Sequence, residues 1–330
     1  MAWRSPSRSQ PIVPVGPGLR NLGNTCFLNA VLQCLAHTAP LANLLLSQRH
    51  SQTCTRRATA FCLLCTFERH VVASFGKGAR SGAAGGVLDP RAIAGRIRLI
   101  AKQMRPGNQE DAHEFLRYFL EHLHRDGSGT HGSSDPASRD ASIVRTIFGG
   151  AVRSTVTCMR CKTPSHTYDP IMDLSLDIQH ADSVARALRS FTRIERLVGA
   201  NQYRCAPCKA LRDATKQVTL AEAPRILTLQ FKRFDFAFGR GHGGGKINRH
   251  IAFETALDVG PYLSHAPAAC WYDLYGVVVH AGHSPNSGHY YAYVRAHNGT
   301  WYRMNDASVS QVGLKTVQAE AAYMLFYARR

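Results

Sequence analysis

A cysteine near the start of the chain and a histidine near its end are residue types from which a nucleophile and its base can be built. Cys26 begins an amphipathic run whose apolar residues recur with helical spacing, which predicts a place in the first turn of a helix. Asn24 or Thr25 can cap that helix, and Pro40 lies beyond its end. In a first turn, unpaired backbone N–H groups and the helix dipole favour a thiolate. A buried core cysteine is the alternative, and composition alone favours it.

His289 supplies the base that such a cysteine lacks. A catalytic thiol needs a base to accept its proton and a third group to orient that base. His289 begins a predicted strand directly after Gly288, a residue that leaves room for a substrate backbone. An Asn-Gly turn then folds the chain back as a hairpin, which brings Asn305 and Asp306 beside the histidine. Asn305 can set the tautomer of the imidazole, and Asp306 can assist or substitute.

Asn21 is the candidate donor to a developing oxyanion. It precedes Cys26 by five residues, so its side-chain amide can act together with the backbone N–H of Cys26. The loop around it is rich in Asn and Gly, and a turn residue is the alternative that spacing alone favours.

Two CxxC pairs have the ligand types of a metal site. Two such knuckles suit a tetrahedral zinc ion with four cysteine ligands. Because four protein ligands leave no open position, the ion would be structural. The stretch between the pairs is longer than in a compact zinc ribbon, and four free thiols are the alternative. The four candidate ligands are Cys158, Cys161, Cys205 and Cys208.

Three further cysteines, Cys54, Cys62 and Cys65, could suggest a second metal. The Cys62–Cys65 pair falls inside a predicted amphipathic helix rather than in a knuckle turn. Burial in the core is therefore favoured for these residues, as it is for Cys34 and Cys270.

The chain up to residue 125 is expected to be mostly helical. A helix is predicted around Phe61–Phe75, and another after Asp89-Pro90 with isoleucines on one face. A further helix, starting at Asn108, would carry Glu110 and Asp111 in its first turn, where the helix dipole favours acids.

The pattern changes after a flexible loop that is expected over Asp126–Ser142. From Ile143 onward, short runs with strand-like alternation predominate, with one helical piece at Ser183–Phe191. A Gly-rich segment, Phe238–Lys246, lacks the spacing of a phosphate loop. Helices followed by antiparallel strands indicate an α+β fold. The candidate strands are Thr146–Cys158, Asp173–Ile178, Arg225–Arg233, Asp273–His280, Tyr290–Arg295, Thr300–Met304 and Tyr323–Tyr327.

Composition limits the classes of protein. The chain has 330 residues, of which 45% are hydrophobic, and this is enough for a large core. No apolar run is long enough to span a membrane, and residues 1–17, which lack the apolar core of a secretory signal, are expected to form a flexible leader. Ten cysteines favour an intracellular protein with a metal site over a disulfide scaffold. The net charge of +18 favours nonspecific contact with nucleic acid, with a solvated basic surface as the alternative.

Several segments of the chain resemble the sequence motifs of the ubiquitin-specific proteases, a family of papain-like cysteine deubiquitinases. The resemblance runs from Gly18 to about Ala328 in the order that the family has. The sub-pattern at Phe61–Cys65 and Gly107–Tyr118 is closest to the branch that includes a nucleolar deubiquitinase. The matching segments are Gly18–Gln33 (cysteine box), Gln109–Phe115 (middle box), Leu229–Phe234 (strand motif), and Gly288–Tyr293 with Trp301–Asp306 (histidine box).

The resemblance implies a catalytic role for each matching residue. Cys26 would be the nucleophile and His289 the general base. Asn305 would orient the histidine, and the share of Asp306 in that role is open. Asn21 would donate to the oxyanion.

The middle box implies a surface that binds substrate. Asp111 and Glu114 would face the arginines of ubiquitin's C-terminal tail, and Gln109 and Gly288 would also contact the substrate. A basic tail needs acidic partners, and residues three apart share one side of a helix. Ordinary acids near a helix N-terminus are the alternative.

The resemblance also implies an architecture. One catalytic domain over residues 18–330 would form a helical thumb (mainly 18–142), fingers (mainly 143–222) and a palm of antiparallel sheet (mainly 223–330). The cysteine pairs at the tip of the fingers would bind structural Zn²⁺, and no organic cofactor is expected.

The implied activity is hydrolysis of the peptide or isopeptide bond after the C-terminal glycine of ubiquitin, through an acyl-enzyme. Ubiquitin and ubiquitinated proteins would be the partners, with no membrane partner. The alternatives are a catalytically weak ubiquitin-binding scaffold, a protease for a related ubiquitin-like modifier, and a zinc-dependent nucleic-acid-binding protein. The nucleus or nucleolus is favoured over the cytoplasm on charge and subgroup resemblance.

Overall fold

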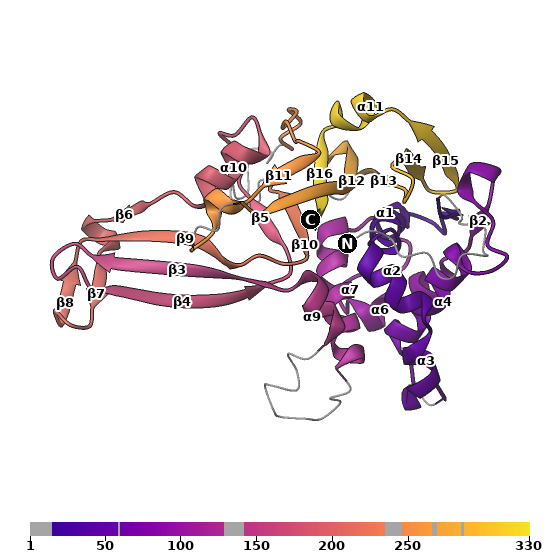
Figure 1. The fold of residues 1–330 in the computed structure, drawn as a ribbon, viewed down its shortest axis with the longest axis horizontal. Helices are drawn as coiled ribbons and strands as arrows, with labels where there is room; N and C mark the ends of the chain where they lie inside the picture. The colour runs from indigo at the N-terminus through magenta and orange to yellow at the C-terminus, as the bar shows by residue number, and fades with distance from the viewer. Residues whose placement is uncertain (1–14, 59, 129–141, 235–245, 266–268, 285–286) are drawn as a thin grey trace.

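The structure, a computed structural model, describes residues 15–58, 60–128, 142–234, 246–265, 269–284 and 287–330. The helices of the first third of the chain gather on one side of the molecule, and long strands project from the other side (Figure 1). An eight-stranded sheet occupies the middle. The α+β class expected from the sequence is confirmed.

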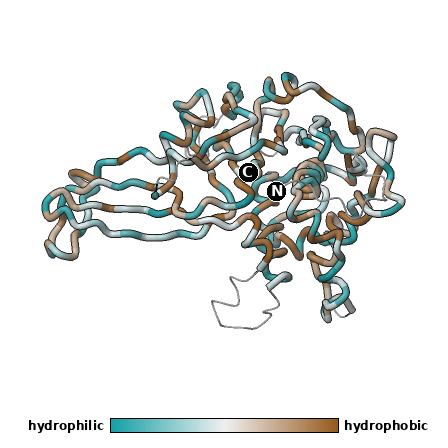
Figure 2. Tube along the Cα trace, in the orientation of Figure 1, coloured by the Kyte–Doolittle hydropathy of each residue, from teal (hydrophilic) through white to brown (hydrophobic). Residues whose placement is uncertain are grey.

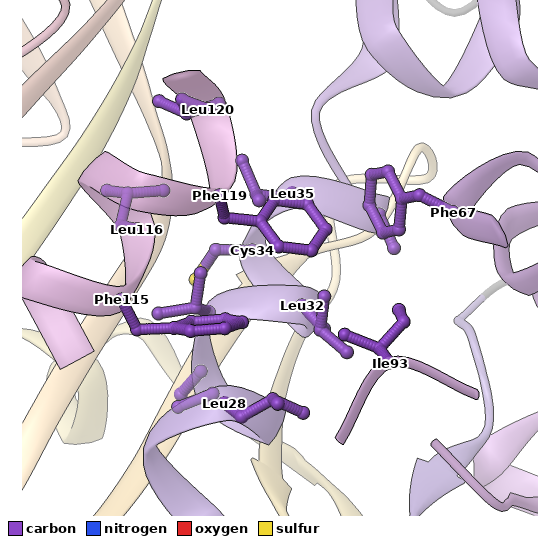
Figure 3. Close-up of a cluster of buried hydrophobic side chains, with 14 of the residues drawn as sticks. Leu28, Leu32, Cys34, Leu35, Phe67, Ile93, Phe115, Leu116, Phe119 and Leu120 are labelled. Atoms are coloured by element: carbon purple, nitrogen blue, oxygen red, sulfur yellow. The ribbon is translucent and has the colours of Figure 1, made fainter. Parts of the chain in front are cut away.

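Helix α1 (Cys26–Ala36) is the centre of the helical part. Every one of its residues is buried, which a helix with apolar residues on all sides requires. Helix α7 (Ala112–Gly127) packs along it, and Phe27 meets Phe115 edge to face with 5.6 Å between ring centroids. Figure 3 shows leucines of α1 and phenylalanines of α7 in one cluster of buried side chains. The helix predicted to begin at Cys26 is thus present and fully enclosed.

Two predicted helix boundaries are wrong. The helix expected after Asp89-Pro90 is split into α5 (Arg91–Ala94) and α6 (Ile97–Ile100), because Arg96 between them leaves the helical backbone region with φ −119°. Helix α7 begins at Ala112 rather than Asn108. The side chain of Asp111 is its N-cap and accepts from two backbone N–H groups, so the chain before it cannot be helical.

The remaining helices of this part cover the other faces of the core. The helix predicted around Phe61–Phe75 is present, and three helical segments that were not predicted precede it. These elements are α2 (Ala39–Leu46), α3 (Arg49–Thr53), η1 (Thr55–Ala58), α4 (Leu63–Phe75) and η2 (Gly82–Ala84).

The central sheet separates two hydrophobic cores. Along β13 (Ser287–Arg295), Tyr290 and Ala292 point into the core shared with the helices, and Tyr291 and Tyr293 into the opposite core. All pairings are antiparallel except β10 with β5. The strands in order are β15 (Ser308–Val312), β14 (Trp301–Asn305), β13, β12 (Trp271–Ser284), β16 (Ala322–Arg329), β10 (Ile226–Phe231) and β5 (Leu174–Leu176), with β11 (Ala256–Asp258) beside β12.

A second sheet forms the projecting fingers. It is predominantly hydrophilic to neutral along its length, unlike the body of the molecule (Figure 2). The strand predicted from Thr146 starts later, because α9 (Ile143–Phe148) occupies its first residues and is capped by the Ser142 hydroxyl. Its strands are β4 (Pro164–Ile171), β3 (Gly150–Cys158), β9 (Ala214–Glu222) and β6 (Glu195–Leu197), with the hairpin of β7 (Tyr203–Cys205) and β8 (Ala210–Arg212) at the tip.

Two short helices lie outside the first part of the chain and complete the fold. Helix α10 (Val184–Phe191) matches the helical piece predicted there and packs in the second core. Helix α11 (Leu314–Gln318) and the η3 (Gly199–Asn201) and η4 (Gly260–Tyr262) turns were not predicted. Among the described residues, none of the helices is long and apolar enough to cross a membrane.

The leader predicted over residues 1–17 does not extend to its last residues. Val15 is buried in the core, and Gln33 Nε2 donates to the Pro17 carbonyl at 2.8 Å. Residues 1–14, 129–141 and 235–245, which hold most of the predicted leader and loops, lie outside the described residues. Helix α7 runs through buried Asp126, so the loop predicted from that residue begins after Gly127.

Candidate active site

The thiol of Cys26 lies where the first turn of α1 meets strand β13. Backbone hydrogen bonds from Tyr290, Phe27 and Cys26 itself reach the sulfur. Neither Asn24 nor Thr25 caps the helix with its side chain, contrary to expectation. Instead, the Thr25 hydroxyl accepts from the backbone N–H of Leu22 at 2.9 Å. The first-turn N–H groups are therefore left directed at the sulfur.

Burial nevertheless dominates the ionisation of this thiol. Desolvation raises the pKa of Cys26 above its ordinary value of 9.0, and the charge of Asp306 also raises it. The backbone N–H groups act in the opposite direction but do not outweigh burial. The direction of this shift is opposite to the one that the helix position favours.

The hairpin of β13 and β14 brings His289 and Asn305 together. Ala292 pairs with Met304, and Gly299 has the positive φ of 84° that the turn requires. His289 Nε2 donates to Asn305 Oδ1 at 2.6 Å. Because Nε2 carries the proton in this bond, Nδ1 keeps its lone pair and can accept a proton.

His289 and Cys26 are connected through the backbone of Tyr290. The N–H that reaches the Cys26 sulfur belongs to Tyr290, the residue directly after His289. No hydrogen bond joins the Cys26 sulfur to the His289 ring, and the structure describes both residues. His289 therefore lies one residue from a backbone group that reaches Cys26, and its ring makes no hydrogen bond to the sulfur.

Asp306 holds other groups than the histidine. Its Oδ2 accepts from Asn21 Nδ2 at 2.9 Å, and its Oδ1 accepts from Asn29 Nδ2 at 2.8 Å. Its backbone carbonyl accepts from the N–H of Leu19 at 2.8 Å, and its φ of 48° turns the chain sharply after β14. The expectation that Asp306 assists or replaces Asn305 at the imidazole is not met by these contacts.

Asn21 lies in a turn that Asp306 ties to the site. Its Oδ1 accepts from the N–H groups of Gly23 at 3.0 Å and Thr25 at 3.3 Å, as in a turn residue. One of the two Nδ2 protons is bonded to Asp306, and the second is available to an oxyanion. The turn interpretation of Asn21 is therefore confirmed, and its role as oxyanion donor stays a prediction.

Gln109 bridges the two sides of the site. Its Oε1 accepts from the Gly288 N–H at 2.8 Å, and its Nε2 donates to Asn24 Oδ1 at 3.5 Å. A Cβ on Gly288 would come within 2.4 Å of His280 Nε2 and 2.6 Å of the Ala281 carbonyl. The missing side chain of Gly288 thus makes room for the protein's own His280, not only for a substrate.

The two acids of the middle box have different surroundings. Asp111 Oδ1 accepts from the N–H groups of His113 and Glu114 at 2.8 and 2.9 Å, and its Oδ2 accepts from the Tyr323 hydroxyl at 2.6 Å. Glu114, half-buried, accepts only from Gln103 Nε2, at 3.2 Å, among the described residues. The carboxylate of Glu114 can consequently accept more hydrogen bonds from a bound molecule than that of Asp111.

The two CxxC pairs meet at the tip of the fingers. The sulfurs of Cys158, Cys161, Cys205 and Cys208 all lie within 4.8 Å of one another, and Cys161 and Cys205 are 3.5 Å apart. A tetrahedral site with Zn–S distances of about 2.3 Å places its sulfurs about 3.8 Å apart. The residue after each pair, Lys162 and Lys209, has a positive φ near the left-handed region, which closes both turns alike. The four sulfurs fit one zinc ion.

Nearly the whole chain matches one known protein family. The family model described as "Ubiquitin carboxyl-terminal hydrolase" matches residues 17–327. The chain belongs to the ubiquitin carboxyl-terminal hydrolase family. The deubiquitinase family predicted from the sequence motifs is therefore confirmed, while the nucleolar branch stays a prediction.

Curated relatives of this hydrolase domain come from fungi, animals and plants. The probable ubiquitin carboxyl-terminal hydrolase 16 of Schizosaccharomyces pombe is 42% identical over 97% of this chain and 68% of its own length. The ubiquitin carboxyl-terminal hydrolase 42 of Homo sapiens is 42% identical over 96% of this chain. The chain spans only 23% of that human protein, and 36% of the Arabidopsis thaliana hydrolase 23, with which it is 44% identical.

Solved structures with the same fold include deubiquitinase complexes. The SAGA DUB module containing Ubp8, bound to monoubiquitin, matches with a TM-score of 0.85 and 30% identity over 98% of this chain and 72% of that one. The same module bound to ubiquitin aldehyde matches with a TM-score of 0.83 and 29% identity over 95% of this chain and 69% of that one.

Three residues of the hydrolase site were not singled out from the sequence. Asn29, buried on α1, holds Asp306, and Tyr323 holds Asp111. His280 is buried against Tyr290, with no hydrogen-bond partner for either ring nitrogen among the described residues. Burial, Lys246 and His289 lower the pKa of His280 to about 4, so it stays neutral beside the catalytic candidate. A helical spacing of Asn29 from Cys26 is the one pattern that could have identified any of them.

Proposed function

We propose that this hydrolase domain cleaves the peptide or isopeptide bond after the C-terminal glycine of ubiquitin, with Cys26 as nucleophile. The observation that carries the proposal is the hydrogen bond from His289 Nε2 to Asn305 Oδ1, because it leaves Nδ1 as a base, one residue before the Tyr290 N–H that reaches the Cys26 sulfur. The thiol proton passes to Nδ1 as the sulfur attacks the glycine carbonyl. The C–N bond then breaks, the departing amine takes the proton from His289, and ubiquitin remains as a thioester.

Water completes the reaction. His289 accepts a proton from the attacking water, the C–S bond breaks, and the sulfur of Cys26 recovers a proton from the imidazolium. In both steps the carbonyl oxygen becomes negative. The second Nδ2 proton of Asn21 and the N–H groups of the first turn of α1 are the donors that stabilise it, and Asp306 positions Asn21 for this purpose.

Ubiquitin as the substrate is supported by the ligands of the two solved modules, one bound to monoubiquitin and one to ubiquitin aldehyde. Within this chain, Glu114 together with Asp111 offers negative charge to the arginines of the ubiquitin tail. A hollow of about 520 Å³ between α7 and the base of the fingers, lined by Arg117, Tyr118 and Glu121 among others, provides a surface for the globular body.

Zinc at the tip of the fingers belongs to this proposal. Cys158, Cys161, Cys205 and Cys208 would hold the ion and join the end of β3 to the β7–β8 hairpin. An ion with four protein ligands supplies cross-linking rather than chemistry. It would keep the polar fingers, which have few apolar contacts of their own, in a shape that receives ubiquitin.

Turnover of ubiquitin with a C-terminal fluorogenic amide tests the proposal. Cys26→Ala and His289→Ala are expected to lower kcat/KM by about 10³-fold or more, because each removes a member of a unit that acts together. Cys34→Ala, a buried cysteine on the same helix, serves as the matched control and should retain turnover. Undiminished turnover in Cys26→Ala would contradict the proposal, and binding of ubiquitin without any turnover by the native protein would favour the scaffold alternative.

Nonspecific contact with nucleic acid and a nuclear or nucleolar location are also proposed, on the net charge of +18. Because such binding depends on phosphate contacts, its affinity for RNA should fall steeply as salt is raised. An affinity independent of salt would argue against it.

A further inference from the structure

A second group of metal-ligand side chains lies in the helical part, far along the chain from the fingers. Its ligand atoms come from His50, Cys54, Cys62 and Cys65, and all of them lie within 4.8 Å of one another. His50 Nε2 is 3.2 Å from Cys62 Sγ. We propose that these four residues bind a second structural zinc ion, independent of the hydrolase reaction.

The position of Cys62 differs from the sequence-based interpretation of these cysteines as core residues within a helix. Cys62 is the N-cap of α4, in an extended conformation with φ −121° and ψ 115°, and Cys65 lies in the first turn. The pair therefore forms a turn that enters a helix, in which both sulfurs can face one point. Burial does not explain the group either, because Cys54 and His50 are only half-buried.

The turn has the same hydrogen bond as the cysteine pair in the fingers. The backbone N–H of Cys65 donates to Cys62 Sγ at 3.4 Å, and the backbone N–H of Cys208 donates in the same way to the sulfur of Cys205. In a CxxC knuckle such a bond stabilises the negative sulfur that ligates the metal. Two CxxC turns of one chain thus share this feature.

The other two ligands come from a helix that has little else to hold it. Helix α3 has five residues and none of them is buried, although so short a helix is not stable by itself. His50 lies in α3 and Cys54 is its C-cap. A metal bound by these two and by the start of α4 would join α3 to the body of the molecule.

The fourth donor, an imidazole nitrogen, favours zinc over a disulfide. Three sulfurs and one imidazole nitrogen are a common tetrahedral zinc set, and four protein ligands leave no open position. The charged groups that act on His50 are Glu68, Asp126 and Arg56. Arg56 also closes the segment between Cys54 and Cys62, through an ion pair with Asp126 at 2.6 Å and a bond to the Phe61 carbonyl at 2.8 Å.

Zinc content by mass spectrometry of the purified full chain tests the inference. We expect about two zinc ions per chain, falling to about one in Cys158→Ser/Cys205→Ser and to about one in His50→Ala/Cys62→Ser. His50→Cys keeps four ligands and should retain both ions. Cys270→Ala, a buried cysteine outside both groups, is the matched control and should also retain both.

If His50→Ala/Cys62→Ser fails to fold, the metal content of Cys158→Ser/Cys205→Ser still tests the inference. Cys158→Ser/Cys205→Ser, loaded with Co²⁺ in place of zinc, should show thiolate-to-cobalt charge transfer and the visible bands of a tetrahedral site, both lost when His50→Ala is added. Folded Cys158→Ser/Cys205→Ser protein that holds no metal would overturn the inference. A native mass lower by two protons under non-reducing conditions, which identifies a disulfide among Cys54, Cys62 and Cys65, would overturn it as well.

Discussion

Two neighbouring side chains at the end of β14 hold different parts of the site. Asn305 accepts from His289 and so fixes which ring nitrogen is basic, whereas Asp306 accepts from Asn21 and Asn29 and so fixes the loop before α1. The sequence places both residues at the returning end of a hairpin and cannot separate their roles. Asp306 follows the last residue of β14 with a φ of 48°, and its carboxylate is occupied by Asn21 and Asn29.

Substitutions of Asn305 and Asp306 should therefore lower the rate of turnover by different amounts. Asn305→Ala removes the acceptor that orients His289, and we expect kcat to fall roughly 10²-fold with KM nearly unchanged. Asn305→Asp keeps an acceptor and should recover most of the rate. Asp306→Asn leaves the bond between His289 and Asn305 intact. Its NH₂ group would face the NH₂ group of Asn21 or Asn29 and lose one hydrogen bond, so a smaller fall in kcat, roughly tenfold, is expected. A larger loss in Asp306→Asn than in Asn305→Ala would assign the orienting role to Asp306.

The raised pKa of Cys26 makes a prediction about alkylation. Burial raises that pKa above 9.0, so the thiolate fraction at neutral pH is small and increases as pH rises. The rate of Cys26 modification by iodoacetamide, in the protein without ubiquitin, should keep rising beyond pH 9. Modification of Cys26→Ala gives the background from the other cysteines. A rate that reaches its plateau near pH 7 would mean a preformed thiolate instead.

At the scale of elements, the sequence predicts which helices and strands carry the site better than it predicts the residues at which they begin and end. The amphipathic run after Cys26 and the Asn-Gly turn after β13 follow from spacing and turn chemistry, and both elements are present. Helix α7 starts later than predicted, because Asp111 caps it. Strand β4 escaped prediction because its residues are exposed and have no apolar alternation. Contacts such as Asp306 with Asn29 depend on packing between distant segments, which spacing does not report.

The N-cap position of Asp111 allows its structural and charge roles to be separated. Asp111→Ala removes the cap of α7 and the acceptor of the Tyr323 hydroxyl, so unfolding free energy should fall by about 1–2 kcal/mol, measured by chemical denaturation. Asp111→Asn keeps a cap and should be close to native stability.

Glu114 provides the complementary substitution. Glu114→Gln removes charge from a side chain that is half-buried and bonded to Gln103, and it should raise KM for ubiquitin several-fold with kcat nearly unchanged. Asp182→Asn, at an exposed acid outside the hollow and the middle box, is the matched control. Equal KM values in Glu114→Gln and the native protein would remove Glu114 from the tail-binding surface.

At the scale of the molecule, the residues proposed for chemistry and those proposed for substrate recognition lie in separate regions. Cys26 and His289 lie where α1 meets the central sheet, while the fingers extend away from the helices and end in the four cysteines (Figure 1). The body is held by two cores, one on each face of the sheet, and the fingers by backbone pairing with mostly polar side chains. A change at the tip should therefore alter ubiquitin binding without altering the reacting groups.

Loss of the fingers' metal ligands tests this separation. Cys161→Ser/Cys208→Ser should raise KM for intact ubiquitin by about tenfold or more, because the surface that receives its body is no longer fixed. The rate on a short peptide that contains only the ubiquitin C-terminus should stay unchanged. A matching loss on both substrates would mean that the fingers support the fold of the catalytic centre itself.

The site of covalent capture by ubiquitin tests the central claim most directly. Ubiquitin with a C-terminal electrophile should form a single adduct, and peptide mass mapping should place it on Cys26. Cys26→Ala should form no adduct, and Cys34→Ala should form it at the native rate. An undiminished adduct in Cys26→Ala, or an adduct mapped to another cysteine, would contradict the assignment of Cys26 as the nucleophile.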